Sequence, residues 1–264
     1  MVQVINLFLP LLLQILILYF LSQAVDRLVL RRLGRGWYLA TMWPGVMIHE
    51  LSHLVGCLLT FTRVYKVQLF YPQGGTLGMV QHEQTRNPLK SIIISIAPLF
   101  GATAVIWLLT RFLLPDFYFS NLDGLKKILS DFSSYQNFFS FTWDYFRQYI
   151  INVQDLIKQF NFSSWQTYLF IYLMLSLSSH AAPSKEDLKH TYFGLIGLAV
   201  IFFLIYLIDQ WLAAHITWAI IQWLTYPVLL TAIFLSYGIM FAAISLAIMG
   251  IISVIVGVFS HIIR

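Results

Sequence analysis

The chain has 264 residues, of which 59% are hydrophobic and only 10% are charged. Because soluble domains carry about 25% charged residues, this composition excludes an ordinary water-soluble fold and predicts an integral membrane protein. The net charge of +5 comes from scattered Lys and Arg, which favours contact with anionic lipid headgroups and excludes a nucleic-acid-binding stripe. A single cysteine, Cys57, excludes an intrachain disulfide and a cysteine-based metal site.

Long apolar runs predict an all-α polytopic membrane protein with six or seven transmembrane helices. A spanning helix needs about 20 apolar residues, and these runs lack the alternation that is typical of barrel strands. The expected spans, in chain order, cover residues 5–24, 37–60, 91–114, 165–182 and 191–211, with room for two more after residue 216 and a break near Gly238.

These spans divide the chain into three expected units. Residues 1–36 form an N-terminal transmembrane helix and a short basic link that contains four arginines. Residues 37–190 form the unit that carries the chemistry described below, and residues 191–264 form the C-terminal transmembrane helices.

Two segments of the middle unit differ from the apolar runs. Residues 62–86 predict a β-hairpin, because 64–71 is β-prone and partly alternating, and a Pro-Gln-Gly-Gly turn follows at 72–75. Residues 115–164 are more polar, and apolar residues recur there at three- and four-residue steps. This pattern indicates an amphipathic helix in the membrane interface, with a solvated linker as the alternative.

The sequence His-Glu-Leu-Ser-His at 49–53 is an H-E-x-x-H motif in the middle of the second expected helix. A spacing of four places the imidazoles of His49 and His53 on one helix face, where both can bind the same Zn²⁺. Glu50 lies beside them, where it can take a proton from a zinc-bound water and return it to the leaving amine. The alternative is a pair of helix histidines packed against polar groups, but ionisable residues at bilayer depth are costly and usually functional.

A transmembrane helix with this motif, followed by a β-prone hairpin and a helix with Ala-Pro-Leu-Phe-Gly at 97–101, resembles the core of the site-2 protease type of intramembrane zinc metalloproteases. The resemblance covers about residues 37–190, and the H-E-x-x-H sequence is its specific part. It implies cleavage of membrane-anchored proteins, with His49 and His53 as zinc ligands and Glu50 as the catalytic base. It also implies a third ligand, an Asp from a later helix.

Three residues are candidates for this third ligand. Leu-Asp-Gly at 122–124 matches the usual pattern of the family, but Asp123 lies in the polar stretch and is interpreted as part of a turn. Asp187 is preferred, because the small residues before it permit close helix packing. Ser184-x-x-Asp187 is also a capping box, which would begin a helix without any metal. His180, just inside the preceding helix, is the remaining candidate.

The sequence therefore predicts an intramembrane zinc metallopeptidase with one Zn²⁺ per chain, whose partners are the lipid bilayer and a membrane-anchored substrate. The strand at 64–71 is expected to bind extended substrate by strand addition. One alternative is a membrane cation transporter or binding protein that uses His49, Glu50 and His53. The other is a catalytically silent membrane scaffold. The substrate, the membrane orientation and the oligomeric state stay open.

Overall fold

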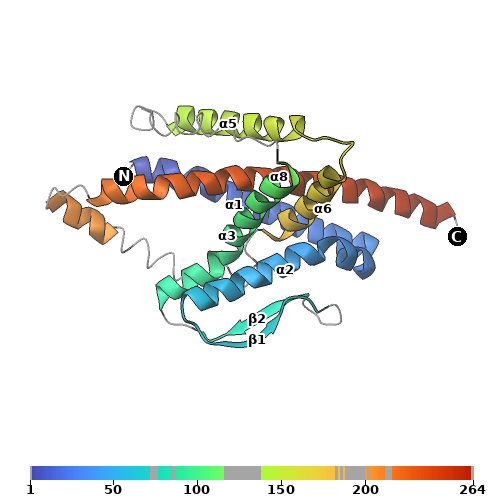
Figure 1. Ribbon diagram of the computed structural model, residues 1–264, viewed down its shortest axis with the longest axis horizontal. Coiled ribbons are helices and arrows are strands. Elements are labelled where there is room, and N and C mark those ends of the chain that lie inside the picture. Colours follow the sequence, from blue (N-terminus) through green and yellow to red (C-terminus); the bar gives the residue numbers. More distant parts are fainter. Residues whose placement is uncertain are drawn as a thin grey trace.

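The computed structural model describes residues 2–71, 77–84, 87–115, 138–181, 184, 187, 200, 203–211 and 216–262. Within these residues the protein is mostly helical, with one two-stranded sheet (Figure 1). The longer elements are α1 (Val2–Leu28), the π-helical η1 (Val29–Leu33), α2 (Arg35–Leu59), β1 (Val64–Gln68), β2 (Met79–His82), α3 (Pro88–Leu113), α5 (Phe138–Lys158), α6 (Trp165–His180) and α8 (Ile216–Ile262).

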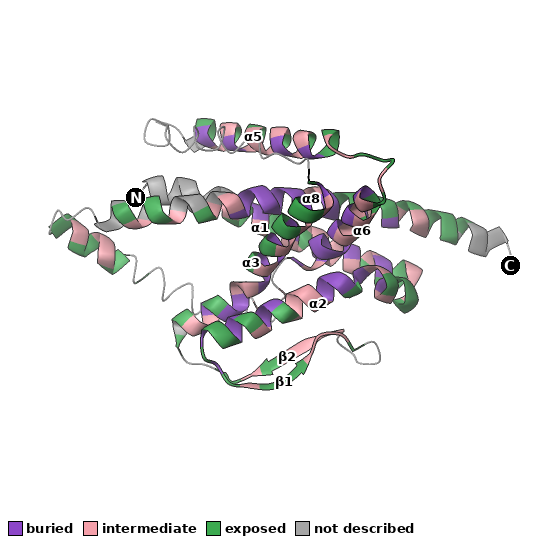
Figure 2. Ribbon diagram, in the orientation of Figure 1, coloured by how far each residue is buried: buried purple, intermediate pink, exposed green. Residues whose placement is uncertain are grey.

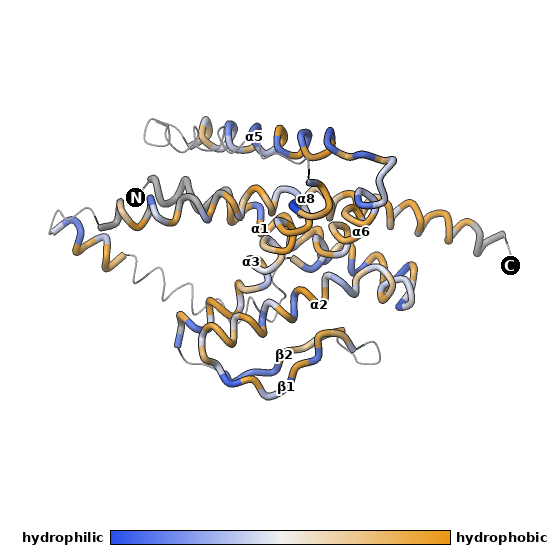
Figure 3. Tube along the Cα trace, in the orientation of Figure 1, coloured by the Kyte–Doolittle hydropathy of each residue, from blue (hydrophilic) through white to orange (hydrophobic). Residues whose placement is uncertain are grey.

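Three helical stretches of the described chain are long and apolar enough to cross a membrane, namely Leu11–Leu33, Leu89–Leu113 and Leu230–Val256. Hydrophobic residues follow one another almost continuously along the C-terminal half of α8 (Figure 3). The helix α2 has 25 residues, but the polar side chains of the motif interrupt its apolar sequence. The expected membrane protein is thus supported, whereas the expected six or seven spans are not confirmed.

The C-terminal region differs from the expectation of two helices. α8 is one continuous helix of 47 residues, so the predicted break at Gly238 is wrong. A glycine inside a helix costs only about 1 kcal/mol, and an apolar environment strongly favours unbroken backbone hydrogen bonding. Gly238 instead faces Leu18 of α1, whose methyl carbons would lie 3.9 Å from an added Cβ. The two helices α1 and α8 pack side by side at this point, as Figure 1 shows.

The amphipathic helix expected in the polar stretch is present as α5. Its buried residues, which include Phe141 and Leu156, lie on one side, and exposed residues occupy the other (Figure 2). Tyr145 donates a hydrogen bond of 3.1 Å to the Gln14 side chain of α1, which in turn donates to the Ala232 carbonyl of α8. The apolar face of α5 therefore packs on protein, and its predicted position in the membrane interface stays a prediction. Residues 116–137 lie outside the described residues.

The predicted hairpin is confirmed as an antiparallel pair of strands. Val67 pairs with Val80 and Gln68 pairs with Met79, and a bulge lies between Val64 and Lys66. The strand β1 ends at Gln68, three residues earlier than expected. In Figure 1, β2 lies between α2 and β1, so the second strand is the nearer one to the motif helix.

Small residues allow α2 to pack closely against its two neighbours, α6 and α3. A Cβ at Gly45 would overlap the Ser176 backbone carbonyl of α6, and the Gly45 N–H donates a hydrogen bond of 2.9 Å to the Ser176 hydroxyl. On α3, a Cβ at Gly101 would collide with Ser52, the residue just before the second motif histidine. Such close approach of helix backbones is typical of small residues in membrane proteins. The motif helix is therefore held tightly on two sides.

Replacing Gly45 with Ala is expected to lower the melting temperature, because the new methyl group meets a backbone carbonyl that moves only with α6. Overpacking of this kind costs about 1–3 kcal/mol. The control is Gly250→Ala in α8, where nothing lies within 4 Å of an added Cβ. Thermal unfolding of both variants in one detergent measures the difference, and a wild-type melting temperature for Gly45→Ala would contradict the close α2–α6 contact.

Candidate metal centre

The helical spacing of the motif brings its two imidazoles together as expected. His49 and His53 lie one turn apart on α2, with their Nε2 atoms 3.2 Å from each other. The ring centroids are 4.9 Å apart and the rings are nearly perpendicular, at 76°. Both side chains are largely shielded, since their exposed fractions are 12% and 10%.

The third member of the group comes from far along the sequence. An Asp187 carboxylate oxygen lies 3.1 Å from His53 Nε2, and the other lies 3.4 Å from His49 Nε2. One nitrogen from each histidine and one carboxylate oxygen all lie within 4.8 Å of one another, so the group could hold a metal ion. The structure thus brings Asp187 to the histidines, as the preferred interpretation of the sequence expected.

Backbone carbonyls decide which ring nitrogens face this centre. His49 Nδ1 donates to the His180 carbonyl of α6 at 2.8 Å, and His53 Nδ1 donates to the Ile94 carbonyl of α3 at 2.9 Å. Because a carbonyl only accepts, each Nδ1 carries the proton, and each neutral imidazole directs its Nε2 lone pair inward. Two nitrogens and a carboxylate oxygen, oriented by second-shell hydrogen bonds, form a donor set that fits a divalent metal ion.

Asp187 also forms the capping box that the sequence offered as the alternative. The Ser184 N–H donates to the Asp187 carboxylate at 2.7 Å, and the Asp187 N–H donates to the Ser184 hydroxyl at 3.2 Å. The two interpretations are therefore compatible. The reciprocal hydrogen bonds restrict the side chain of Asp187, and this restriction holds its carboxylate next to the histidines.

Glu50 lies next to the centre and is held by the hairpin. The Val80 N–H of β2 donates a hydrogen bond to the Glu50 carboxylate. Gly78 lies so close that an added Cβ would be 2.5 Å from Glu50 Cγ. The second strand, and not the first, therefore lies beside the candidate base.

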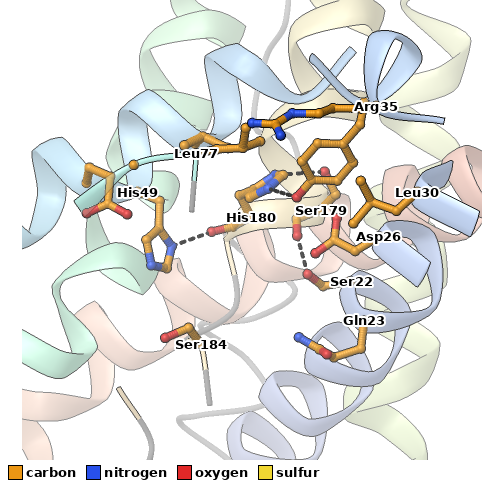
Figure 4. Close-up of a pocket in the computed structure, with 14 residues that line it drawn as sticks. Ser22, Gln23, Asp26, Leu30, Arg35, His49, Leu77, Ser179, His180 and Ser184 are labelled. Atoms are coloured by element: carbon orange, nitrogen blue, oxygen red, sulfur yellow. Dashed lines mark hydrogen bonds between the residues drawn. The ribbon is translucent and has the colours of Figure 1, made fainter. Parts of the chain in front are cut away.

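The other two candidates for the third ligand are placed differently. The His180 ring points away from the centre, with Nε2 3.3 Å from the Tyr38 hydroxyl and Nδ1 3.1 Å from the Ser179 hydroxyl (Figure 4). Its contribution to the centre is the backbone carbonyl that orients His49. Asp123 lies outside the described residues.

A pocket of about 430 Å³ adjoins the centre, and its lining includes His49 and Glu50 together with Asp26 of α1 and Tyr38 of α2. His49 and Asp26 lie in different parts of this pocket (Figure 4). Sequence reasoning missed Asp26 and Tyr38 as site residues. The available signal was an acidic residue inside an apolar stretch, since Asp26 falls within the candidate span Leu11–Leu33.

Comparisons with known proteins give no family assignment. No protein-family model matches the chain, and no curated protein or solved structure matches it either. The functional interpretation therefore rests on the geometry of the site and on the sequence motif.

Measurements of metal binding distinguish the role of Asp187 as a metal ligand from its role as a helix cap. His49→Ala, His53→Ala and Asp187→Asn are expected to lose bound metal in elemental analysis, because each removes one of the converging donors. Ser184→Ala removes the hydroxyl that accepts from the Asp187 N–H but keeps the backbone N–H that donates to the Asp187 carboxylate, so it should cost about 1 kcal/mol of stability and retain metal. Wild-type metal affinity in Asp187→Asn, measured by chelator competition, would show that the carboxylate is only a cap.

Proposed function

We propose that the protein is an intramembrane zinc metalloprotease of the site-2 protease type, which hydrolyses peptide bonds in membrane-embedded or membrane-proximal segments of membrane-anchored proteins. The observation that carries the proposal is the convergence of His49, His53 and Asp187 beside the carboxylate of Glu50. Catalytic zinc sites use three protein ligands of these types and leave a fourth position for water or substrate.

Each residue of the site has its own role in the proposed reaction. His49, His53 and Asp187 would hold the zinc, which when bound lowers the pKa of water and polarises the scissile carbonyl. Glu50 accepts the proton of the attacking water and returns it to the leaving amine. The Val80 N–H orients the Glu50 carboxylate, and the His180 and Ile94 carbonyls keep the imidazoles in the ligating tautomer.

Substrate presentation requires an extended peptide, because the amides of a transmembrane helix are hydrogen-bonded internally. Strand addition to the hairpin supplies such a conformation. Sequence reasoning favoured the edge of 64–71, but β2 is the strand beside Glu50. Since the Val80 N–H points to Glu50, the Val67–Val80 pair is of the non-hydrogen-bonded kind, and the two N–H groups face opposite edges. The edge of β2 is therefore the better candidate for binding substrate.

The transporter alternative predicts further ligand groups along a path through the helices. Among the described residues, His49, His53 and Asp187 form the single cluster of metal-ligating side chains. A single ligand group next to a carboxylate base favours hydrolysis over transport. The silent-scaffold alternative predicts metal retention without peptide cleavage, which the next experiment tests.

Glu50→Gln is expected to fold and retain zinc but to reduce cleavage at least about 100-fold, because an amide of equal size cannot accept the proton. The matched control is Glu83→Gln, which makes the same change at an exposed position after β2. Turnover of a membrane-anchored substrate panel and zinc content are measured for both. Near-normal cleavage by Glu50→Gln would exclude Glu50 as the base, and no cleavage by the zinc-loaded wild type would favour a scaffold.

Two proline substitutions distinguish the edges of the hairpin. His82→Pro removes an N–H at the same edge of β2 as Val80 but leaves the bond from Val80 to Glu50 intact, whereas Val67→Pro removes one at the opposite edge. His82→Pro is expected to slow cleavage strongly and Val67→Pro only weakly, with zinc content unchanged in both. Steady-state rates on an extended peptide measure the contrast. The reverse order of effects would assign substrate binding to β1.

A further inference from the structure

The part of the pocket farthest from the motif contains an acidic group whose hydrogen bonding is incomplete. Asp26 lies on α1, within the candidate span Leu11–Leu33, and its carboxylate lines the same pocket as His49 and Glu50. The Tyr38 hydroxyl is hydrogen-bonded to Asp26. The Oδ1 atom of Asp26 is buried and has no hydrogen-bond partner among the described residues. Buried polar atoms of this kind are rare, because each one costs about 1–3 kcal/mol.

The surrounding groups hold Asp26 without supplying the missing donor. The His180 Nδ1 atom lies beside the Ser176 carbonyl and so carries the ring proton, which leaves Nε2, 3.3 Å from the Tyr38 hydroxyl, as an acceptor. The single proton of the Tyr38 hydroxyl therefore lies between Asp26 and His180 and does not reach the second Asp26 oxygen. Beside them, the Ser22 hydroxyl donates to the Ser179 carbonyl. Figure 4 shows Ser22, Asp26, Ser179 and His180 gathered on one side of the pocket. This part of the pocket therefore contains a carboxylate with one oxygen that receives no hydrogen bond from the described residues.

We infer that this part of the pocket is a substrate subsite that binds a basic side chain close to the scissile peptide bond, with Asp26 as the specificity-determining residue. The inference rests on the proposed protease function, because the pocket joins Asp26 to Glu50 and His49. The same pocket therefore contains Asp26 and the candidate catalytic groups.

The chemistry of the lining favours lysine. Leu30, Val46 and Leu77 provide apolar surface for a four-carbon stem, and Asp26 lies within reach of a terminal ammonium group. Arg35 also lines the pocket, but its side chain is exposed, so solvent screens its charge more than that of the buried carboxylate. The volume of about 430 Å³ lies within the range of small-ligand sites.

The test measures binding in the Glu50→Gln protein, which keeps the metal ligands and does not consume the probe. Fluorescent peptides carry one Lys at successive positions of a neutral extended host, and matched peptides carry norleucine instead. At one position, Lys is expected to bind roughly tenfold or more tightly than norleucine, as for a hydrogen bond to a charged group. Adding Asp26→Asn should abolish this ratio, since Asn still accepts from Tyr38. The control Glu83→Gln, which removes an exposed carboxylate, should preserve it.

Absence of a Lys preference at every position in the Glu50→Gln protein would overturn the subsite, and so would a preference that survives Asp26→Asn. Phosphatidylethanolamine has a similar ammonium group, so the titration is repeated in micelles with and without this lipid. Loss of the preference in its presence would assign the pocket to lipid and overturn the inference. Parallel cleavage assays keep the two proposals separate. If Lys is preferred in an Asp26-dependent way but the wild type cleaves no substrate, the subsite is supported and the protease function is rejected. If the wild type cleaves substrate but no position prefers Lys, the protease function is supported and the subsite is rejected.

Discussion

The hydrogen bonds from two imidazole Nδ1 atoms to backbone carbonyls determine the geometry on which the candidate site depends. His49 is bonded to the His180 carbonyl of α6, and His53 is bonded to the Ile94 carbonyl of α3. Each bond selects one tautomer and turns the remaining lone pair toward the partner histidine. Without them, two rings on one helix face would still be neighbours, but nothing would make both Nε2 atoms converge with the same carboxylate.

These hydrogen bonds require α3 and α6 to lie very close to α2, and small residues permit this approach. Gly45 lets the backbone of α6 come into contact, and Gly101 of α3 leaves space for Ser52. Apolar surfaces between membrane helices gain little from excluding lipid, so dispersion contacts and interhelical hydrogen bonds must hold them together. The hydrogen bond from the Gly45 N–H to the Ser176 hydroxyl is one such bond. The geometry of the site thus depends on helix packing, because the helices that pack against α2 also provide the carbonyls that orient its histidines.

Polar groups elsewhere in the helical body are also paired across elements. Tyr145 of α5 is bonded to Gln14 of α1, which is bonded to the Ala232 carbonyl of α8. This chain of bonds joins the amphipathic helix to two of the candidate spans. Asp26 departs from the pattern, since one of its buried oxygens lacks a partner among the described residues. Gln159 Oε1 and Ser245 Oγ are in the same condition, but of these three residues only Asp26 lines the pocket that also contains His49 and Glu50.

The sequence by itself determined the features that depend on local periodicity. Apolar runs predicted α1, α3 and α6, the alternating segment and its turn predicted the hairpin, and the four-residue spacing placed His49 and His53 on one face. Local patterns also suggested a break at Gly238, but α8 continues through this residue as one helix, because an apolar environment favours unbroken backbone hydrogen bonding.

Only the tertiary structure decided which distant groups meet the motif. Asp187, Asp123 and His180 were all chemically acceptable as a third ligand, and local sequence contains no information on which one reaches α2. The packing of α6 on α2 turns the His180 ring toward Tyr38 and leaves its carbonyl for His49, while the cap with Ser184 directs Asp187 inward. The position of β2 beside Glu50 has the same origin. Contacts between residues more than a hundred positions apart depend on how whole helices pack, and no local periodicity encodes that packing.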